Sequence, residues 1–171
     1  MSDENQSLDN GEEVQPAEGE RVFLCVVDES EEFDVALRFA CNRANNTGGR
    51  VALAYIVAPA EFQHWVGIGN LMEQEGREQA EEMVRVVGEV VQQRTGKMPI
   101  VYIRSGKPHE ELVTLIDEEP QIAVLVLGAS ISGNGPGPIV THIVNEMSGG
   151  FHVPITIVPG GMSEKEIDSI T

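Results

Sequence analysis

Five short, uninterrupted apolar runs, separated by amphipathic segments, leave this chain few possible folds. The runs cover residues 21–27, 50–57, 98–104, 121–129 and 152–159. A strand with one solvent-exposed face alternates apolar and polar residues, whereas a strand buried on both faces has a continuous apolar sequence. The pattern therefore predicts five buried strands in a largely parallel sheet with helices on both faces.

The segments between the runs have helical periodicity. We predict helices over residues 31–46, 72–96 and 107–120 and within 137–150, with a long connection over 58–71. The apolar positions expected to face the core in the first two helices are Phe33, Ala36, Leu37, Ala40, Cys41 and Ala44, and then Met83, Val86, Val87, Val90 and Val91. Right-handed crossovers between such strands favour an α/β, doubly wound sheet in three layers.

The two ends of the sequence differ from its middle. Residues 1–20 hold seven acidic residues, no Lys or Arg and almost no large apolar side chain, so we expect a disordered acidic tail. Residues 21–160 are expected to form the single folded domain. Residues 161–171 follow two glycines and are expected to be a loose or helical C-terminal tail.

Charge and cysteine usage exclude several classes of partner. The formal net charge is -17, a field that repels nucleic acid and anionic lipid, so we expect neither as a partner. Cys25 and Cys41 lie in apolar segments without metal-ligand spacing, and we expect buried, unpaired thiols. No apolar run is long enough to span a bilayer and the N-terminus lacks a signal-peptide pattern, so we expect a cytoplasmic protein.

A ligand of such a sheet binds beyond the carboxyl ends of the strands, where the winding reverses. The first run leaves through "VVDES", which places Asp28 at a strand end; it can accept hydrogen bonds from a ligand, or Asp28 or Ser30 can cap the following helix. The fourth run leaves through "LGASISGNGPGPIVTH", residues 127–142, a loop rich in Gly and Pro. This loop is either a phosphate cradle or a plain rigid turn.

Five pieces of the sequence, in order and spacing, resemble the universal stress protein family. They are "VVDESEEFDVALRFA", "VALAYIVAP", "YIRSGKPHEELVTLI", "IAVLVLGAS" and "VPITIVP", and they extend over about residues 20–160. The resemblance implies a flavodoxin-like, Rossmann-like five-stranded sheet with strand order 3-2-1-4-5. It also implies dimers, formed by pairing of the last strand, and a division into members that bind ATP and members that do not.

The resemblance carries specific residues with it. A nucleotide site would use Asp28, Val57, Gly128, Ser130, Gly133 and His142. A dimer interface on the last strand would use Val153, Ile155, Thr156, Ile157 and Val158. An apolar strand at a sheet edge exposes unpaired backbone groups, and pairing with its copy under two-fold symmetry covers them.

The loop departs from the pattern of the family's ATP binders, G-x2-G-x9-G-[S/T]. The four motif positions fall on Gly128, Ile131, Thr141 and His142, so one glycine of three is kept. A shifted register is an alternative, in which Gly128 and Gly133 frame a loop that closes at Gly137. Glycines in such loops let backbone N–H groups approach the phosphates, so the departure weakens the motif's chemistry.

The charge of the loop and its prolines weaken the case for phosphate binding further. No Lys or Arg occurs from Gln121 to Pro159, and Arg104 and Lys107 are the nearest possible donors from elsewhere in the sequence. Pro136 and Pro138 remove two N–H donors from the loop itself. His142 can reach a phosphate or be a surface or packing residue.

The sequence shows no catalytic constellation. Ser130 and Ser132 have no base beside them, and the four histidines share no helical i, i+4 spacing that would suggest zinc. They are His64, His109, His142 and His152. We therefore expect no enzyme.

Two functional hypotheses follow. The first is a dimeric stress-response module with a degraded ATP-binding motif that works through protein interaction and needs no cofactor. The alternative is a protein that binds ATP or AMP, with Mg²⁺, and changes its dimer or partner affinity. A flavin protein is a weaker third hypothesis, because no aromatic residue stands near the loop. Trp65, with Phe62 and Ile68, forms a lid, a partner anchor or a cap on the core.

Overall fold

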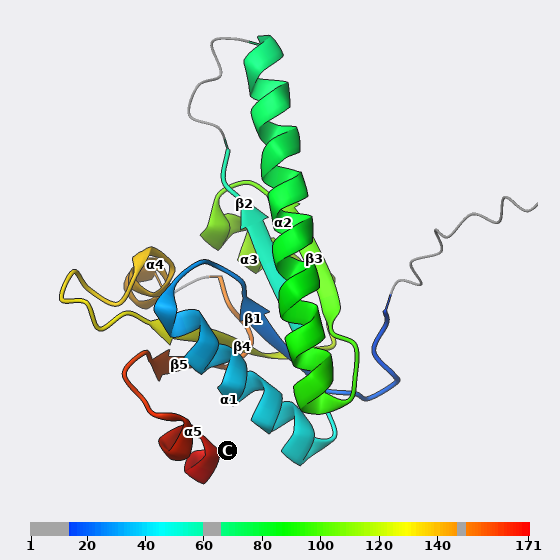
Figure 1. Ribbon diagram of the computed structural model, residues 1–171, viewed down its shortest axis with the longest axis vertical. Coiled ribbons are helices and arrows are strands. Elements are labelled where there is room, and N and C mark those ends of the chain that lie inside the picture. Colours follow the sequence, from blue (N-terminus) through cyan, green and yellow to red (C-terminus); the bar gives the residue numbers. More distant parts are fainter. Residues whose placement is uncertain (1–13, 60–65, 147–149) are drawn as a thin grey trace, which may run out of the picture.

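The computed structural model describes residues 14–59, 66–146 and 150–171. Its elements in sequence order are β1 (Val22–Val26), α1 (Glu31–Thr47), β2 (Arg50–Val57), α2 (Val66–Thr95), β3 (Ile100–Ser105), α3 (Pro108–Glu118), β4 (Ile122–Ala129), α4 (Pro138–Glu146), β5 (Ile155–Pro159) and α5 (Glu164–Ile170). The five strands form one parallel sheet with order β3-β2-β1-β4-β5. The predicted flavodoxin-like, doubly wound architecture is confirmed (Figure 1).

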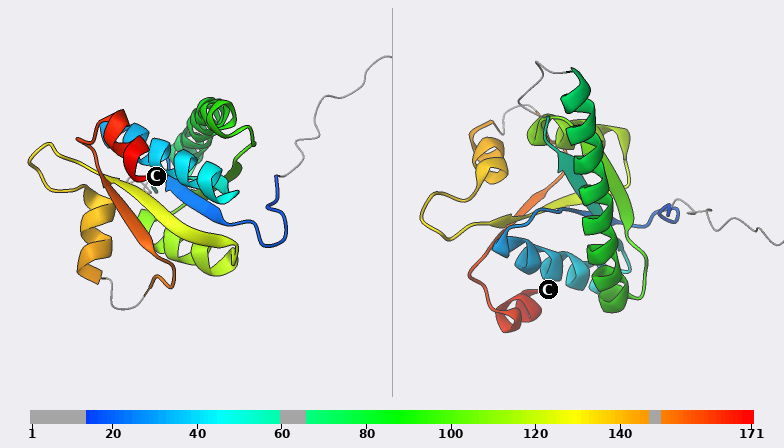
Figure 2. Two further views of the ribbon diagram at one scale, coloured as in Figure 1. Left: turned by 90° about the horizontal axis from the view of Figure 1, so that it is seen from below. Right: turned by 45° about the horizontal axis from the view of Figure 1, so that its top comes forward.

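The helices cover both faces of this sheet, which explains the uninterrupted apolar runs (Figure 2). On β1, Phe23 and Cys25 pack in a core with α1, α2 and α5. The intervening Val22 and Leu24 pack in a second core with α3 and α4. Successive side chains of a strand point to opposite faces, so a strand buried on both has no polar position.

Helix α1 follows its sequence prediction closely. All six predicted core positions are buried, and the helix ends at Gly48, which adopts the left-handed conformation with φ 69°. The N–H of Gly48 bonds to the carbonyls of Ala44 and Asn45 and so closes the last turn.

Helix α2 differs from the prediction in its start and in its buried face. It begins at Val66, so part of the expected connection over 58–71 is helical. Its fully buried positions are Ala80, Val84, Val87 and Val91, whereas Val86 is exposed. These positions are spaced by four, three and four residues, so they lie on one face of the helix. The predicted set was wider and included Val86, which lies off that face. The N-terminal part of α2 projects beyond the sheet (Figure 1).

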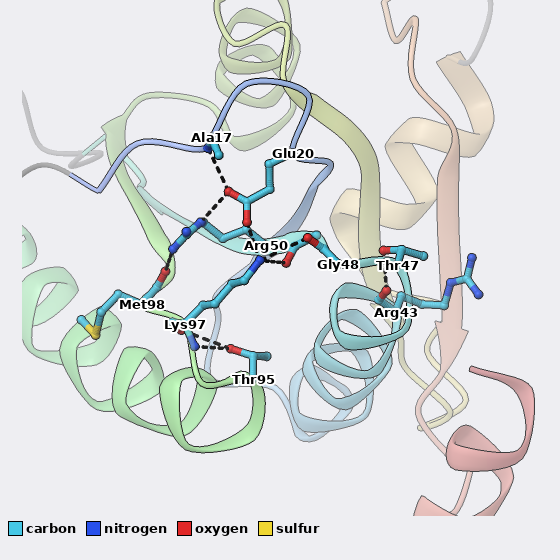
Figure 3. A network of polar contacts seen from close by, with 10 residues as sticks. Ala17, Glu20, Arg43, Thr47, Gly48, Arg50, Thr95, Lys97 and Met98 are labelled. Carbon is cyan, nitrogen blue, oxygen red and sulfur yellow. Dashed lines mark hydrogen bonds and ion pairs between the residues drawn. The ribbon is translucent and has the colours of Figure 1, made fainter.

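Both termini of the described protein take part in the fold. The C-terminal segment forms α5, which begins with a capping box between Ser163 and Glu166 and buries Ile167 against α1. Residues 1–13 lie outside the described residues, so their predicted disorder stays a prediction. Glu20, the last residue of the predicted tail, forms ion pairs with Arg50 and Lys97 (Figure 3).

Strand β5 lies at one edge of the sheet. Leu125 N donates to Pro154 O at 3.0 Å. In a parallel ladder this places the N–H groups of Thr156 and Val158 toward β4 and those of Ile155 and Ile157 toward the open edge. Of the predicted interface residues, Val158 is buried within its own protomer, and Ile157 is 38% exposed.

The cysteines are as expected. Cys25 and Cys41 are buried free thiols, and burial raises the pKa of both, that of Cys41 to about 11. Within the described part of the protein, no helix is long and apolar enough to cross a membrane.

Candidate ligand site at the carboxyl ends of the strands

The carboxyl ends of β1 and β4 meet where the winding of the sheet reverses. A small hollow of about 60 Å³ lies there, lined by Asp28, Ser30, Glu32 and Gly128 together with residues 136–140. Beside it, a cavity of about 450 Å³ opens between β1, β2 and the starts of α3 and α4. Its lining is Val26, Val27, Asp28, Ile56, Pro108, His109, Pro138, Ile139 and His142. The site lies where the topology predicts one.

Asp28 lines both hollows. Its Oδ1 accepts hydrogen bonds from the N–H of Ser30 at 3.0 Å and from the hydroxyl of Ser30 at 2.5 Å. Ser30 is the N-cap residue of α1, but its side chain makes no capping bond. Asp28 Oδ2 accepts no hydrogen bond from the described residues. One carboxylate oxygen therefore orders the turn, and the other is available to a donor on a ligand.

Gly128 has a packing role that does not involve phosphate. A Cβ atom on Gly128 would lie 2.5 Å from the carbonyl oxygen of Glu32. A Cβ atom on Gly160, just after β5, would lie 2.8 Å from the Cβ of Glu32. The first turn of α1 is thus pressed against the ends of β4 and β5, and only glycine leaves room for it.

The glycine-rich loop closes on itself. The N–H of Ser130 donates to the carbonyl of Pro136 at 3.1 Å, and the hydroxyls of Ser130 and Ser132 lie 2.9 Å apart. Neither Ser130 nor Gly133 lines the two hollows, and Gly133 is exposed. The geometry is that of an exposed turn whose first N–H donor is already engaged.

Two histidines meet at the wall of the larger cavity. His142 of α4 and His109 of α3 stack with ring centroids 3.6 Å apart and planes tilted by 35°. The sequence singled out His142 but missed His109, because the two are far apart in the sequence. The signal that was available is topological: α3 and α4 each begin at the carboxyl end of a parallel strand and pack on the same face of the sheet, so their N-terminal ends lie at one edge of it.

Val57 and Ile56 illustrate the opposite faces of β2. Val57 lies under α2, where a Cβ on Gly76 would be 3.0 Å from its Cγ1. Ile56 points to the other face and lines the larger cavity. Phe62, His64 and Trp65 lie outside the described residues, as does the side chain of Ile68.

The cations near the site are engaged by acids. Arg104 pairs with Glu118 at 2.5 Å, and Lys107 pairs with Glu110 at 3.0 Å. The hydrogen bond from Lys107 holds the pKa of Glu110 below its usual range. No Lys or Arg of the described residues lines either hollow, and no group of three metal-ligating side chains occurs among them. His109 and His142 supply the side-chain nitrogen atoms in the lining of the larger cavity.

Known proteins share both the sequence pattern and the fold. The model of the universal stress protein family matches residues 20–159. No curated protein shows significant sequence similarity to this one. The universal stress protein UspA from Lactobacillus plantarum superposes with a TM-score of 0.67 at 18% identity, over 81% of this chain and 97% of that one.

Two further solved structures carry nucleotides. A universal stress protein from Archaeoglobus fulgidus in complex with dAMP has a TM-score of 0.59 at 17% identity, over 81% of this chain and 97% of its own. A universal stress protein in complex with cAMP has a TM-score of 0.59 at 14% identity, over 83% and 98%. At these identities the likeness concerns the fold. The family match spans nearly the whole folded domain, and this protein belongs to the universal stress protein family.

Proposed function

We propose that this protein is a dimeric regulatory module of the stress response that acts through protein contacts and does not hold a nucleoside triphosphate. The observation that carries the proposal is the closed loop after β4, in which Ser130 N–H is bonded to Pro136 O. A phosphate cradle needs several free N–H groups aimed at one point.

Electrostatics supports the same conclusion. The small hollow beside the loop is lined by the carboxylates Asp28 and Glu32. The N-terminus of a helix contributes roughly half a positive charge, too little to offset these acids and a triphosphate together. Lys107 and Arg104 do not make up the difference, because each is paired with a glutamate.

The experiment that tests this uses purified, untagged protein. The protein is denatured and filtered, and the filtrate is analysed for nucleotide by anion-exchange chromatography. ATP with Mg²⁺ is then titrated into the native protein by calorimetry. We expect no co-purified ATP and no heat of binding at high micromolar protein. Stoichiometric ATP, or a micromolar dissociation constant, would contradict the proposal.

A second candidate function rests on the larger cavity. Its volume of about 450 Å³ and its largely apolar lining suit a small organic ligand such as a nucleoside or its monophosphate. Asp28 Oδ2 can accept from a ligand donor, and the histidine pair can face a single anionic group. The dAMP and cAMP complexes of two structural relatives make an adenine nucleotide the first ligand to test.

Adenosine, AMP and cAMP are the probes for this second function. If the cavity binds one of them, Asp28→Asn should weaken binding on the order of tenfold, the value of one hydrogen bond to a charged group. The matched control is Asp34→Asn, because Asp34 lies on α1 away from the cavity. Equal affinities of the two variants would place the ligand elsewhere.

We also propose that the protein catalyses no reaction of its own. The hydroxyls of Ser130 and Ser132 bond to each other, and neither bonds to a described histidine or carboxylate. A nucleophile needs a base within hydrogen-bond reach. Incubation with ATP and Mg²⁺ should release no phosphate above the rate of a buffer blank, and sustained turnover would overturn this view.

A further inference from the structure

The turn between β4 and α4 carries a reactive pair of residues at its tip. Asn134 and Gly135 are both exposed. Gly135 has a φ of 90°, and no heavy atom beyond its two chain neighbours lies within 4 Å of the position that a Cβ would occupy. Among the described residues, neither the side-chain amide of Asn134 nor the N–H of Gly135 takes part in a hydrogen bond. Both groups are therefore open and unengaged.

We propose that Asn134 is a site of spontaneous covalent modification, in which it deamidates through a cyclic imide formed with the backbone of Gly135. The Gly135 nitrogen attacks Asn134 Cγ and loses its proton, a new N–Cγ bond forms, and the bond between Cγ and Nδ2 of Asn134 breaks to release ammonia. Water then opens the five-membered imide at either carbonyl. The product is aspartate or isoaspartate, and the balance is one water consumed and one ammonia released, with no oxidant or reductant.

Glycine at the following position makes this site faster than others. A Cβ on the attacking residue would crowd the approach of its nitrogen to Cγ of the asparagine, and Gly135 has none. Exposed loop tips are also where the backbone has the freedom to reach the cyclic geometry.

The other asparagines whose side chains the structure describes differ in just these respects. Asn42, Asn45 and Asn46 lie in α1, and their side-chain amides donate to Asp168, to the carbonyl of Arg94 and to the carbonyl of Thr171. Asn145 is exposed but lies in α4 and is followed by Glu146. Asn145 is thus a matched internal comparison, because it is also exposed but is held in a helix.

The modification would change the loop that borders the candidate site. It adds a carboxylate to a turn whose Pro136 lines the same hollow as Asp28 and Glu32. Isoaspartate also routes the backbone through the former side chain and lengthens it by one methylene. That extra atom falls inside the turn closed by Ser130 N and Pro136 O, so the closing bond should be lost. The proposal goes beyond the proposed function and does not depend on it.

The test is ageing of the full-length protein in mildly alkaline buffer, followed by peptide mapping with fragmentation that distinguishes isoaspartate from aspartate. We expect Asn134 to convert on the order of tenfold or more faster than Asn145, because Asn134 precedes a residue without Cβ and Asn145 precedes Glu146. Asn10–Gly11 has the same dipeptide in the N-terminal segment and serves as the reference, converting at a rate comparable to that of Asn134.

Variants and a second readout separate the two parts of the proposal. Asn134→Gln should abolish the conversion mapped to the peptide that holds residue 134 and leave that at Asn10 unchanged, whereas Asn145→Gln should leave both unchanged. Amide hydrogen exchange at Ser130 should accelerate in the isoaspartate form and remain slow in Asn134→Asp, which adds the charge without the methylene. Conversion of Asn134 no faster than that of Asn145 overturns the proposal. Unchanged exchange at Ser130 in the isoaspartate form overturns its structural consequence.

Discussion

At the scale of single residues, the candidate site depends on a glycine, because the absence of a Cβ atom lets two segments pack closely. Gly128 falls on the first glycine when the family's ATP-binding motif is laid over the sequence, yet its immediate neighbour in this structure is the backbone of Glu32. The residue that looked most like a phosphate ligand is thus required by the packing of α1 on β4.

Gly128→Ala should therefore destabilise the protein whether or not it binds a nucleotide. The new methyl group would lie 2.5 Å from Glu32 O, and overpacking of this kind costs about 1–3 kcal/mol. Urea unfolding measures the change. The control is Gly88→Ala in α2, where the new Cβ would lie 3.5 Å from Pro99 in ordinary contact and should stabilise by up to about 1 kcal/mol. Two variants of equal stability would refute the packing argument.

Glu20 is the second residue whose surroundings decide its behaviour. Its side chain is 6% exposed, with Oε2 3.0 Å from Arg50 Nε and Oε1 2.6 Å from Lys97 Nζ (Figure 3). Burial acts to raise the pKa of Glu20, but hydrogen bonds from Lys97, the Ala17 amide and Arg50 outweigh it and lower the pKa from 4.5 to about 2. The charged form is therefore the one that stabilises the fold.

Glu20→Gln should lower the free energy of unfolding by about 1–3 kcal/mol at neutral pH, since it leaves two cations without their carboxylate. Because the folded-state pKa lies below the ordinary value, this contribution is complete above about pH 4.5 and is lost as the pH falls through about 2. Urea unfolding across this range should show the two proteins converging in acid. Glu18→Gln, at an exposed position, should show no such convergence, and a constant gap for Glu20→Gln would contradict the assignment.

At the scale of elements, the short helix α5 is held by one apolar anchor and a polar clasp. Ile167 is fully buried in the core shared with α1 and α2. Arg38 donates from Nε and Nη2 to the two carboxylate oxygens of Asp168 at 2.9 and 2.7 Å, and Asn42 donates to the same carboxylate. These bonds hold the pKa of Asp168 at about 2. The C-terminal segment is therefore part of the folded domain.

Ile167→Ala should cost about 2–5 kcal/mol, the range for truncating a buried large aliphatic side chain. Ile170→Ala is the matched control, because Ile170 lies on the same helix and is exposed. Thermal unfolding of the two variants gives the comparison. If both lose the same small amount, α5 does not contribute to the core.

At the scale of the whole molecule, the two edges of the sheet are formed by different strands, and β5 is the one proposed to pair with a second copy. Strand β3 forms one edge of the sheet and β5 forms the other. Ile157 on β5 is 38% exposed and its N–H faces outward, whereas the N–H of Thr156 faces β4. A proline at Thr156 would thus disrupt the sheet itself, and Ile157 is the better position at which to test the proposed dimer.

Ile157→Lys should convert the dimer to a monomer, because two-fold pairing of β5 brings two copies of the new charge together at an apolar edge. Val101→Lys places the same charge on the opposite edge strand, at a residue that is 43% exposed, and should leave the dimer intact. Size-exclusion chromatography with light scattering reports both masses. A dimer that survives Ile157→Lys, or a wild type that is monomeric, would reject the interface.

The sequence by itself determined the architecture, because continuous apolar runs and helical periodicity report local burial directly. It placed Asp28, Gly128 and the loop after β4 at one end of the sheet through the same regularities. Only the tertiary structure decided the rest: that Gly128 faces Glu32, that Ser130 closes its loop on Pro136, and that His109 meets His142. The contacts of Gly128 with Glu32 and of His109 with His142 join residues far apart in the sequence, so they arise from how the layers pack. The bond from Ser130 to Pro136 lies within one loop, whose irregular conformation follows no periodic pattern.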